Sequence, residues 1–290
     1  MLLRILSTWD FEPLPAVGIL VALGLYLWGV MLVGVKPPGR RWPAGRTVSF
    51  VSALVLLWIA VMGPIGAYDD TFFWAHMTQH LMLMMVVAPL LLIGAPVLLL
   101  LQASSRATRK RWIVPVLRSR AVWIMTNPVL TWLLFAGVLL GTHFSPLYNY
   151  SVVHPMVHQF VEHPLYLGVA LLYYYPLIGA NPNPHGLPSL GKAVSLLLQM
   201  VPETMTGFFI FSAGYVLYPA YATVYRPFGP GPLPDQQLGG ALMWGIGMVI
   251  DAVWIAVAVR GWLLEEERKA RRIDQEIARS AGSADGRLPA

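Results

Sequence analysis

The stretch HMTQHLMLMMVVAPLLLIGAP, residues 76–96, opens with two histidines four residues apart and then continues without a charged side chain. An α-helix needs about 20 apolar residues to cross the hydrocarbon core of a bilayer. Side chains four residues apart lie on one face of a helix, separated by about 6 Å along its axis. The stretch therefore predicts a membrane-spanning helix that carries two imidazoles at one membrane surface.

The composition of the whole chain indicates an integral membrane protein. Of its 290 residues, 57% are hydrophobic and 12% are charged, whereas about 25% of the residues of a soluble domain are charged. The mean hydropathy is +0.61. The chain has no cysteine, which excludes both disulfides and metal sites built from thiolates.

Apolar stretches of spanning length predict the fold class, an all-α polytopic membrane protein that forms a bundle of seven transmembrane helices. The stretches cover residues 16–35, 48–66, 79–101, 122–141, 161–180, 191–217 and 237–262. We therefore expect a seven-span membrane domain at 1–262 and a charged cytoplasmic tail at 263–290. Asp10 and Glu12 precede the first stretch and no small-residue cleavage site follows it, so we interpret it as a span and not as a signal peptide.

Basic residues in short loops mark the cytoplasmic side of a membrane protein. With seven spans, all of the 20 Lys and Arg residues except Arg4 and Arg226 fall on one side. This split predicts an N-terminus outside the cell and a C-terminus in the cytoplasm. It also explains the basic residues as anchors at the lipid bilayer surface, so we expect no nucleic-acid partner.

The same topology sorts the histidines. All seven except His185 fall on the predicted outer side. A second motif, HPMVHQFVEHP (154–164), places His154, His158 and Glu162 at steps of four residues. Pro155 suits the first turn of a helix, whereas Pro164 disfavours helical geometry at the residue before it. We therefore expect a short interfacial helix over 155–162, a break, and then the fifth span.

Two histidine pairs at helical spacing on one membrane face favour a metal site. Neutral imidazole binds copper, zinc and iron, and thioether sulfur selects Cu(I). Five methionines lie near the histidines in the sequence: Met77, Met82, Met84, Met85 and Met156. Copper is the metal that this combination favours, with zinc and haem left open. The alternative is that the histidines are hydrogen-bonded caps and the methionines are packing residues. His143 is a further candidate on the same face.

Two acidic residues lie deep in predicted spans. Glu203 falls in the sixth stretch and Asp251 in the seventh, and no Lys or Arg lies at that depth to pair with them. An ionised carboxylate there costs several kcal/mol, so these intramembrane acids are either protonated and structural or part of a proton or cation path. The chain contains no phosphate-binding glycine loop, nucleophile elbow or zinc-protease motif, and we expect no enzyme activity.

Three segments together resemble the CtaG-type multi-spanning assembly factors of caa3-type cytochrome c oxidases. They are residues 76–96, YSVVHPMVHQFVEHPLYLGVALLYYYPLIG (150–179) and DQQLGGALMW (235–244). The resemblance covers about residues 15–262. It implies a protein of the bacterial cell membrane that helps to mature the oxidase, a component of the respiratory chain, by handling copper.

The resemblance also implies partners and ligands. The partners would be cytochrome c oxidase subunits and other copper chaperones. The positions that match the histidine motifs, with Glu162 beside them, become candidate metal ligands: His76, His80, His154, His158 and His163. Asp235 lies just before the last span, on the same face. Two alternatives remain open, a haem-binding membrane electron carrier and a metal or proton transporter that uses the deep acids.

Overall fold

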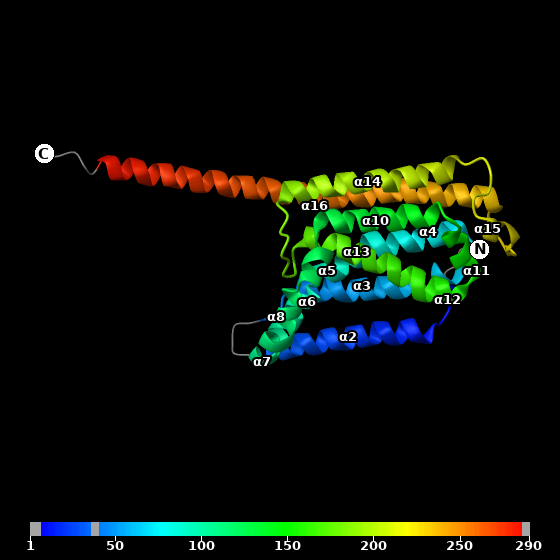
Figure 1. Ribbon diagram of the computed structural model, residues 1–290, viewed down its shortest axis with the longest axis horizontal. Coiled ribbons are helices and arrows are strands. Elements are labelled where there is room, and N and C mark those ends of the chain that lie inside the picture. The colour runs from blue at the N-terminus through cyan, green and yellow to red at the C-terminus, as the bar shows by residue number, and fades with distance from the viewer. Residues whose placement is uncertain (1–6, 36–40, 286–290) are drawn as a thin grey trace.

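The computed structural model describes residues 7–35 and 41–285, with side chains as far as residue 276 (Figure 1). Within these residues the regular elements are all helices, which confirms the all-α prediction. Four of the basic residues used to predict the orientation, Arg4, Lys36, Arg40 and Arg287, lie outside the described residues.

Helices occupy each of the seven expected places. They are α2 (Pro13–Gly34), α3 (Ala44–Met62), the run from α4 (Phe73–Leu81) through η2 (Met82–Val87) and α5 (Ala88–Ile93) to α6 (Pro96–Ala103), α10 (Pro128–His143), α13 (His163–Ile178), α14 (Ser189–Ser212) and α16 (Pro232–Asp285). Five of these, α2, α3, the α4–α6 run, α14 and α16, are long and apolar enough to cross a membrane. The 16-residue α10 qualifies only together with α11 (Pro146–Val153), from which it is bent by 71°. The structure thus supports five to six spans, and the count of seven stays a prediction.

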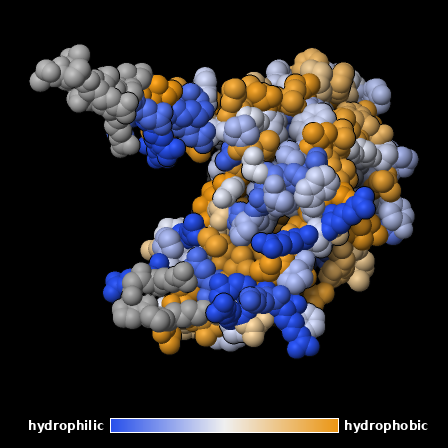
Figure 2. Space-filling view, turned by 60° about the vertical axis from the view of Figure 1, so that its left-hand side comes forward, coloured by the Kyte–Doolittle hydropathy of each residue, from blue (hydrophilic) through white to orange (hydrophobic). Residues whose placement is uncertain are grey.

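The two ends of the bundle differ in chemistry. The histidine end holds the start of α4 together with α11, α12 (Pro155–Val157) and α15 (Pro219–Thr223), and the described N-terminal segment begins there (Figure 1). The basic end holds α7 (Arg106–Thr108), η3 (Arg109–Ile113), α8 (Val114–Leu117) and α9 (Arg120–Met125), and α16 extends far beyond it. Hydrophilic side chains gather at the basic end, whereas apolar ones cover the flanks (Figure 2). Basic residues and histidines are therefore separated as expected, while the side of the membrane that each end faces stays a prediction.

Three π-helical segments interrupt the α-helices, and each is followed two residues later by a proline. η2 precedes Pro89, η3 precedes Pro115, and η4 (His158–Glu162) precedes Pro164. Proline lacks the amide N–H, and its ring clashes with the carbonyl of the preceding α-helical turn. A wider π turn moves that carbonyl away from the ring. The expected break before the fifth span is therefore wrong, because the helix continues from α12 through η4 into α13.

Helices α14 and α16, which carry Glu203 and Asp251, pack closely against each other. A Cβ on Gly207 would lie 2.8 Å from the backbone nitrogen of Trp244 and 3.0 Å from the backbone oxygen of Gly240. Small residues at such crossings let two helix backbones approach closely. α16 also packs along α4, the helix that carries His76 and His80.

Candidate metal centre

Five of the six histidines expected on one face lie buried at the histidine end. His76 and His80 come from α4, His143 from the end of α10, His158 from η4 and His163 from the start of α13. In an α-helix, residues 158 and 163 would point in different directions. The π turn of η4 takes more than four residues per turn, so His158, Glu162 and His163 all face inward.

The carboxylate of Glu162 lies at the centre of three imidazoles. Its Oε1 lies 3.2 Å from Nε2 of His76 and 3.3 Å from Nε2 of His80, and its Oε2 lies 3.9 Å from Nε2 of His158. The rings are in contact, since those of His76 and His158 are stacked at 4.8 Å and those of His76 and His80 meet edge to face at 4.3 Å. We call these four residues the Glu162 cluster.

Tyr221 determines which nitrogen of His76 carries the proton. The Tyr221 hydroxyl donates to the backbone oxygen of Asp69 at 2.7 Å and lies 3.0 Å from Nδ1 of His76. A hydroxyl has one hydrogen, so Nδ1–H of His76 must donate to the Tyr221 oxygen. In the neutral ring, Nε2 then presents a lone pair to Glu162. A histidine whose other nitrogen is held by a hydrogen bond is the arrangement found in metal-ligating histidines.

Several polar atoms of the Glu162 cluster have no hydrogen-bond partner in the part of the chain that the structure describes, although Nε2 of His76 lies within hydrogen-bonding distance of Oε1 of Glu162. Nε2 of His158, both ring nitrogens of His80 and Oε2 of Glu162 are buried without a hydrogen-bond partner among the described residues. Protonation of His76 would let its Nε2–H donate to Glu162, but it would leave these atoms of His80 and His158 without hydrogen-bond partners. Ligands bound at 2.0–2.1 Å around a tetrahedral metal are about 3.3 Å apart, and the distances from Oε1 of Glu162 to His76 (3.2 Å) and His80 (3.3 Å) are close to this value. His76, His158 and Glu162 thus form a group of possible ligands.

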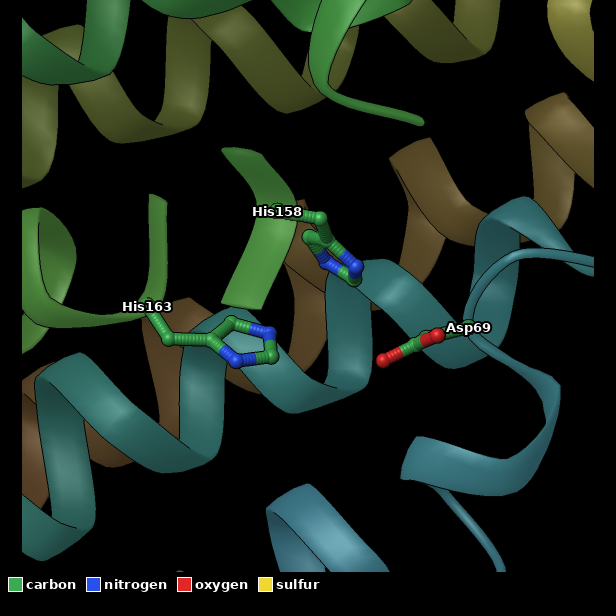
Figure 3. A group of neighbouring side chains, drawn as sticks. All are labelled: Asp69, His158 and His163. Atoms are coloured by element: carbon green, nitrogen blue, oxygen red, sulfur yellow. The ribbon is translucent and has the colours of Figure 1, made fainter. Parts of the chain in front are cut away.

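A second group of possible ligands joins His158 and His163 to Asp69, and Figure 3 shows their side chains directed toward one region between the helices. In this group, Gln79 already forms hydrogen bonds to Asp69 and His163. Its amide donates to Oδ2 of Asp69 at 2.7 Å and to the Ala60 carbonyl at 3.0 Å, so its oxygen accepts from Nε2 of His163 at 2.8 Å. This group is therefore better hydrogen-bonded than the Glu162 cluster and is the weaker candidate for a metal.

Burial shapes the charge state around these ligands. It raises the pKa of Asp69 well above the usual range of a carboxyl, although the hydrogen bond from Gln79 acts in the opposite direction. Burial, assisted by the neighbouring His76, lowers the pKa of His158 to about 4 against the opposing effect of Glu162. His158 is thus neutral at physiological pH, which is the form that binds metal.

Asp235 positions the helix that carries His76 and His80. Its carboxylate is fully buried and accepts hydrogen bonds from the backbone nitrogens of Phe73 (2.9 Å) and Trp74 (3.1 Å) at the start of α4. It also pairs with Arg226 at 2.8 Å, and Arg226 donates to the backbone oxygen of Tyr221 at 2.9 Å. Asp235 therefore contributes to the Glu162 cluster indirectly, through α4 and Tyr221.

The structure does not bring every candidate residue to the cluster. His154 is exposed, stacks on Tyr150 at 4.0 Å and lies outside the Glu162 cluster. Glu203 and Asp251 are buried on α14 and α16. His143 joins the buried group, with Nδ1 donating to the Leu139 carbonyl at 2.8 Å.

Sequence reasoning missed the residues that orient the ligands, namely Asp69, Gln79, Tyr221 and Arg226. Gln79 carries a signal in hindsight, because it is a polar residue between two histidines in an apolar stretch. Tyr221 carries none, since it is separated from His76 by 145 positions.

Comparisons with known proteins agree with the motifs quoted above. Residues 24–265 match the family described as cytochrome c oxidase caa3 assembly factor. Uncharacterised proteins of Mycobacterium bovis and Mycobacterium tuberculosis are each 27% identical over 283 residues, and one of Mycobacterium leprae is 28% identical over 288 residues. These matches cover 94% of the chain but span only 42% of the length of each relative. No solved structure matches the chain.

Proposed function

This chain belongs to the family of cytochrome c oxidase caa3 assembly factors, and we propose that it acts by binding copper at the Glu162 cluster and passing it to a copper centre of the oxidase. The copper ion is the cargo of the protein. The proposed partner is an oxidase subunit, with other copper chaperones as donors of the ion on the outer side of the bacterial cell membrane.

One observation carries this proposal. Three imidazole nitrogens surround one carboxylate in a buried site, and several of these polar atoms have no hydrogen-bond partner in the described part of the chain. Leaving a buried polar group unsatisfied costs about 1–3 kcal/mol. A bound cation would satisfy Nε2 of His80, Nε2 of His158 and Oε2 of Glu162 together, which is a physical reason for the cluster to exist.

The donor set agrees with copper. Imidazole nitrogen suits copper, zinc and iron. A thiolate site is excluded because the chain has no cysteine. His76, His80 and His158 would each supply one nitrogen and Glu162 one oxygen. Because all four residues are buried, exchange of the ion needs a local opening at the histidine end, which contact with a partner subunit would supply.

The geometry of the histidines does not favour the alternative function, a haem-binding electron carrier. The histidine rings contact one another, and this leaves no space between them for a porphyrin. The cavity beside His80 and His143 has a volume of about 20 Å³, close to the space that a single water needs. A Soret absorption band in the purified protein would show bound haem and would support this alternative.

The proposal is tested by copper content and oxidase activity together. We expect Glu162→Gln and His158→Gln to lower the copper affinity of the detergent-purified protein by tenfold or more while leaving its helix content unchanged. The matched controls are His154→Gln and His185→Gln, whose histidines lie outside the cluster and should bind copper as the wild type does.

In cells, the cluster variants should accumulate normally but leave the oxidase short of copper. Added copper should restore part of the activity by mass action. Wild-type copper binding by Glu162→Gln, together with full oxidase activity, would contradict the proposal.

A further inference from the structure

A small cavity lies beside the Glu162 cluster, enclosed by α4, η2, α10, α14 and α16. Its volume is about 20 Å³, so it has room for one water or one dehydrated ion but not for an ion with its hydration shell. Four methionines line it, Met77, Met84, Met85 and Met243. The remaining lining residues are His80, His143, Glu203, Leu81, Phe135 and Leu139. We call this space the methionine cavity.

The polar groups around the methionine cavity lack partners. Nε2 of His143, both nitrogens of His80 and both carboxylate oxygens of Glu203 are buried without a hydrogen bond to any described residue. Since Nδ1 of His143 donates to the Leu139 carbonyl, its Nε2 carries a lone pair in the neutral ring. In the neutral ring one nitrogen of His80 also carries a lone pair, so His143, His80 and Glu203 each offer an acceptor atom to which no described residue donates.

The position of Glu203 depends on a glycine of the facing helix. A Cβ on Gly247 would collide with Oε1 of Glu203. The absence of a side chain at Gly247 leaves room for the carboxylate between α14 and α16.

We infer that the methionine cavity is a second metal site, which takes a soft monovalent cation, Cu(I). Thioether sulfur is a ligand that selects Cu(I), and imidazole suits copper as well. A monovalent ion would be neutralised by the single carboxylate of Glu203, which matches the absence of any Lys or Arg from the lining. Zn²⁺ would leave a net positive charge in a low-dielectric region, which is costly.

His80 connects the two sites. Its Nε2 lies 3.3 Å from Oε1 of Glu162, and its side chain also lines the methionine cavity. Its two ring nitrogens can therefore serve the Glu162 cluster and the cavity in turn. The exchange of copper between the methionine cavity and the Glu162 cluster rests on the proposed function, because it requires that the Glu162 cluster binds copper.

The cysteine-free chain allows a direct test. Purified full-length protein is titrated with Cu(I) under anaerobic conditions against a chromophoric chelator, and the bound metal is examined by X-ray absorption. With 13 methionines and no cysteine, any Cu–S scattering must come from thioethers. We expect the wild type to bind two Cu(I) ions per chain and to show Cu–S scattering.

The test variant replaces Met77, Met84, Met85 and Met243 by leucine, which has a similar volume and preserves packing. It should bind one Cu(I) ion and lose the Cu–S signal. Glu203→Gln should weaken the same site tenfold or more. The matched control replaces four exposed methionines by leucine, at Met31, Met125, Met156 and Met205, and should bind two ions with the Cu–S signal intact.

The outcomes separate this inference from the proposed function. Two ions and an unchanged Cu–S signal in the cavity variant would overturn the methionine site, whatever the Glu162 cluster does. Loss of the Cu–S signal in the cavity variant but wild-type binding in Glu162→Gln would instead support the methionine site and refute the Glu162 cluster. Thermal unfolding of each metal-free variant checks that the fold is retained.

Discussion

Replacement of Asp235 by asparagine tests how the protein holds its candidate ligands. Asparagine keeps one oxygen that can accept from one of the two backbone N–H groups at the start of α4, but its amide nitrogen cannot accept from the other, so only part of the capping interaction is retained. It removes the negative charge 2.8 Å from Arg226, whose side chain is 11% exposed. Breaking a buried ion pair by removing one partner costs about 3–5 kcal/mol, because the other charge stays buried without compensation.

We therefore expect Asp235→Asn to lower the free energy of unfolding by about 3–5 kcal/mol. Detergent-driven unfolding can be followed by the fluorescence of the 11 tryptophans. Because Arg226 also holds the backbone of Tyr221, the partner of His76, copper affinity should fall as well.

The double variant Asp235→Asn/Arg226→Gln provides the control. The double variant removes the Arg226 cation, which would otherwise be left without Asp235. It also loses two hydrogen bonds from Arg226 to backbone oxygens, each worth about 1 kcal/mol. The double variant should therefore be more stable than Asp235→Asn alone. A double variant that is less stable than the single one would refute the reasoning that Asp235 acts chiefly by compensating Arg226.

Four further predictions concern the ligands, the packing and the topology. Tyr221→Phe removes the acceptor for Nδ1–H of His76, and it should weaken copper binding by about 10- to 100-fold in a chelator competition; unchanged affinity would exclude this role. Metal-free protein should lose stability as the pH falls from about 6.5 toward 4, because the unfolded chain protonates an imidazole whose pKa burial lowers to about 4 at His158. His158→Gln should reduce, but not abolish, the pH dependence of thermal unfolding between pH 7.5 and 5, and an equal slope in both proteins would speak against it. Gly94→Ala would place a Cβ 2.7 Å from that of Phe50 and should cost about 1–3 kcal/mol, whereas Gly18→Ala, inside α2, meets no atom within 4 Å and should stabilise the protein by up to about 1 kcal/mol. Single cysteines at positions 70, 150 and 230 should label from outside intact cells, and those at 42, 110 and 270 should not; outside labelling at 110 would reverse the predicted orientation.

Much of the arrangement could be predicted from the apolar pattern. Helices occupy all seven expected places, and the basic segments lie at the end of the bundle opposite the histidine cluster. The spacing of His76 and His80 placed both on one buried face of α4. These features are local, because the backbone of an apolar segment in lipid must satisfy its hydrogen bonds internally and so becomes helical whatever its neighbours are.

The prolines show where local reasoning fails. Pro164 predicts a break, yet the chain continues through a π turn, and that turn brings Glu162 and His163 to the same side as His158. Four-residue spacing also grouped His154 with His158, but the π turn begins only after His154, which stays exposed. The sequence pattern does not distinguish a proline that ends a helix from one that widens it.

The sequence by itself therefore determined that the chain is an all-α membrane protein with most of its histidines and most of its basic residues at opposite ends, because hydropathy and charge act on each segment separately. Only the tertiary structure decided which imidazoles meet Glu162 and that Tyr221 orients His76. It alone also decided that Asp235 holds the start of α4 and that Glu203 faces a methionine-lined cavity. The contacts of His76 with Glu162, of Tyr221 with His76 and of Asp235 with Phe73 join residues that are 86 to 162 positions apart. They depend on how each helix is rotated about its axis and on the close approach of helices at small residues, which are settled by packing between distant parts of the chain and not by the periodicity of any one of them.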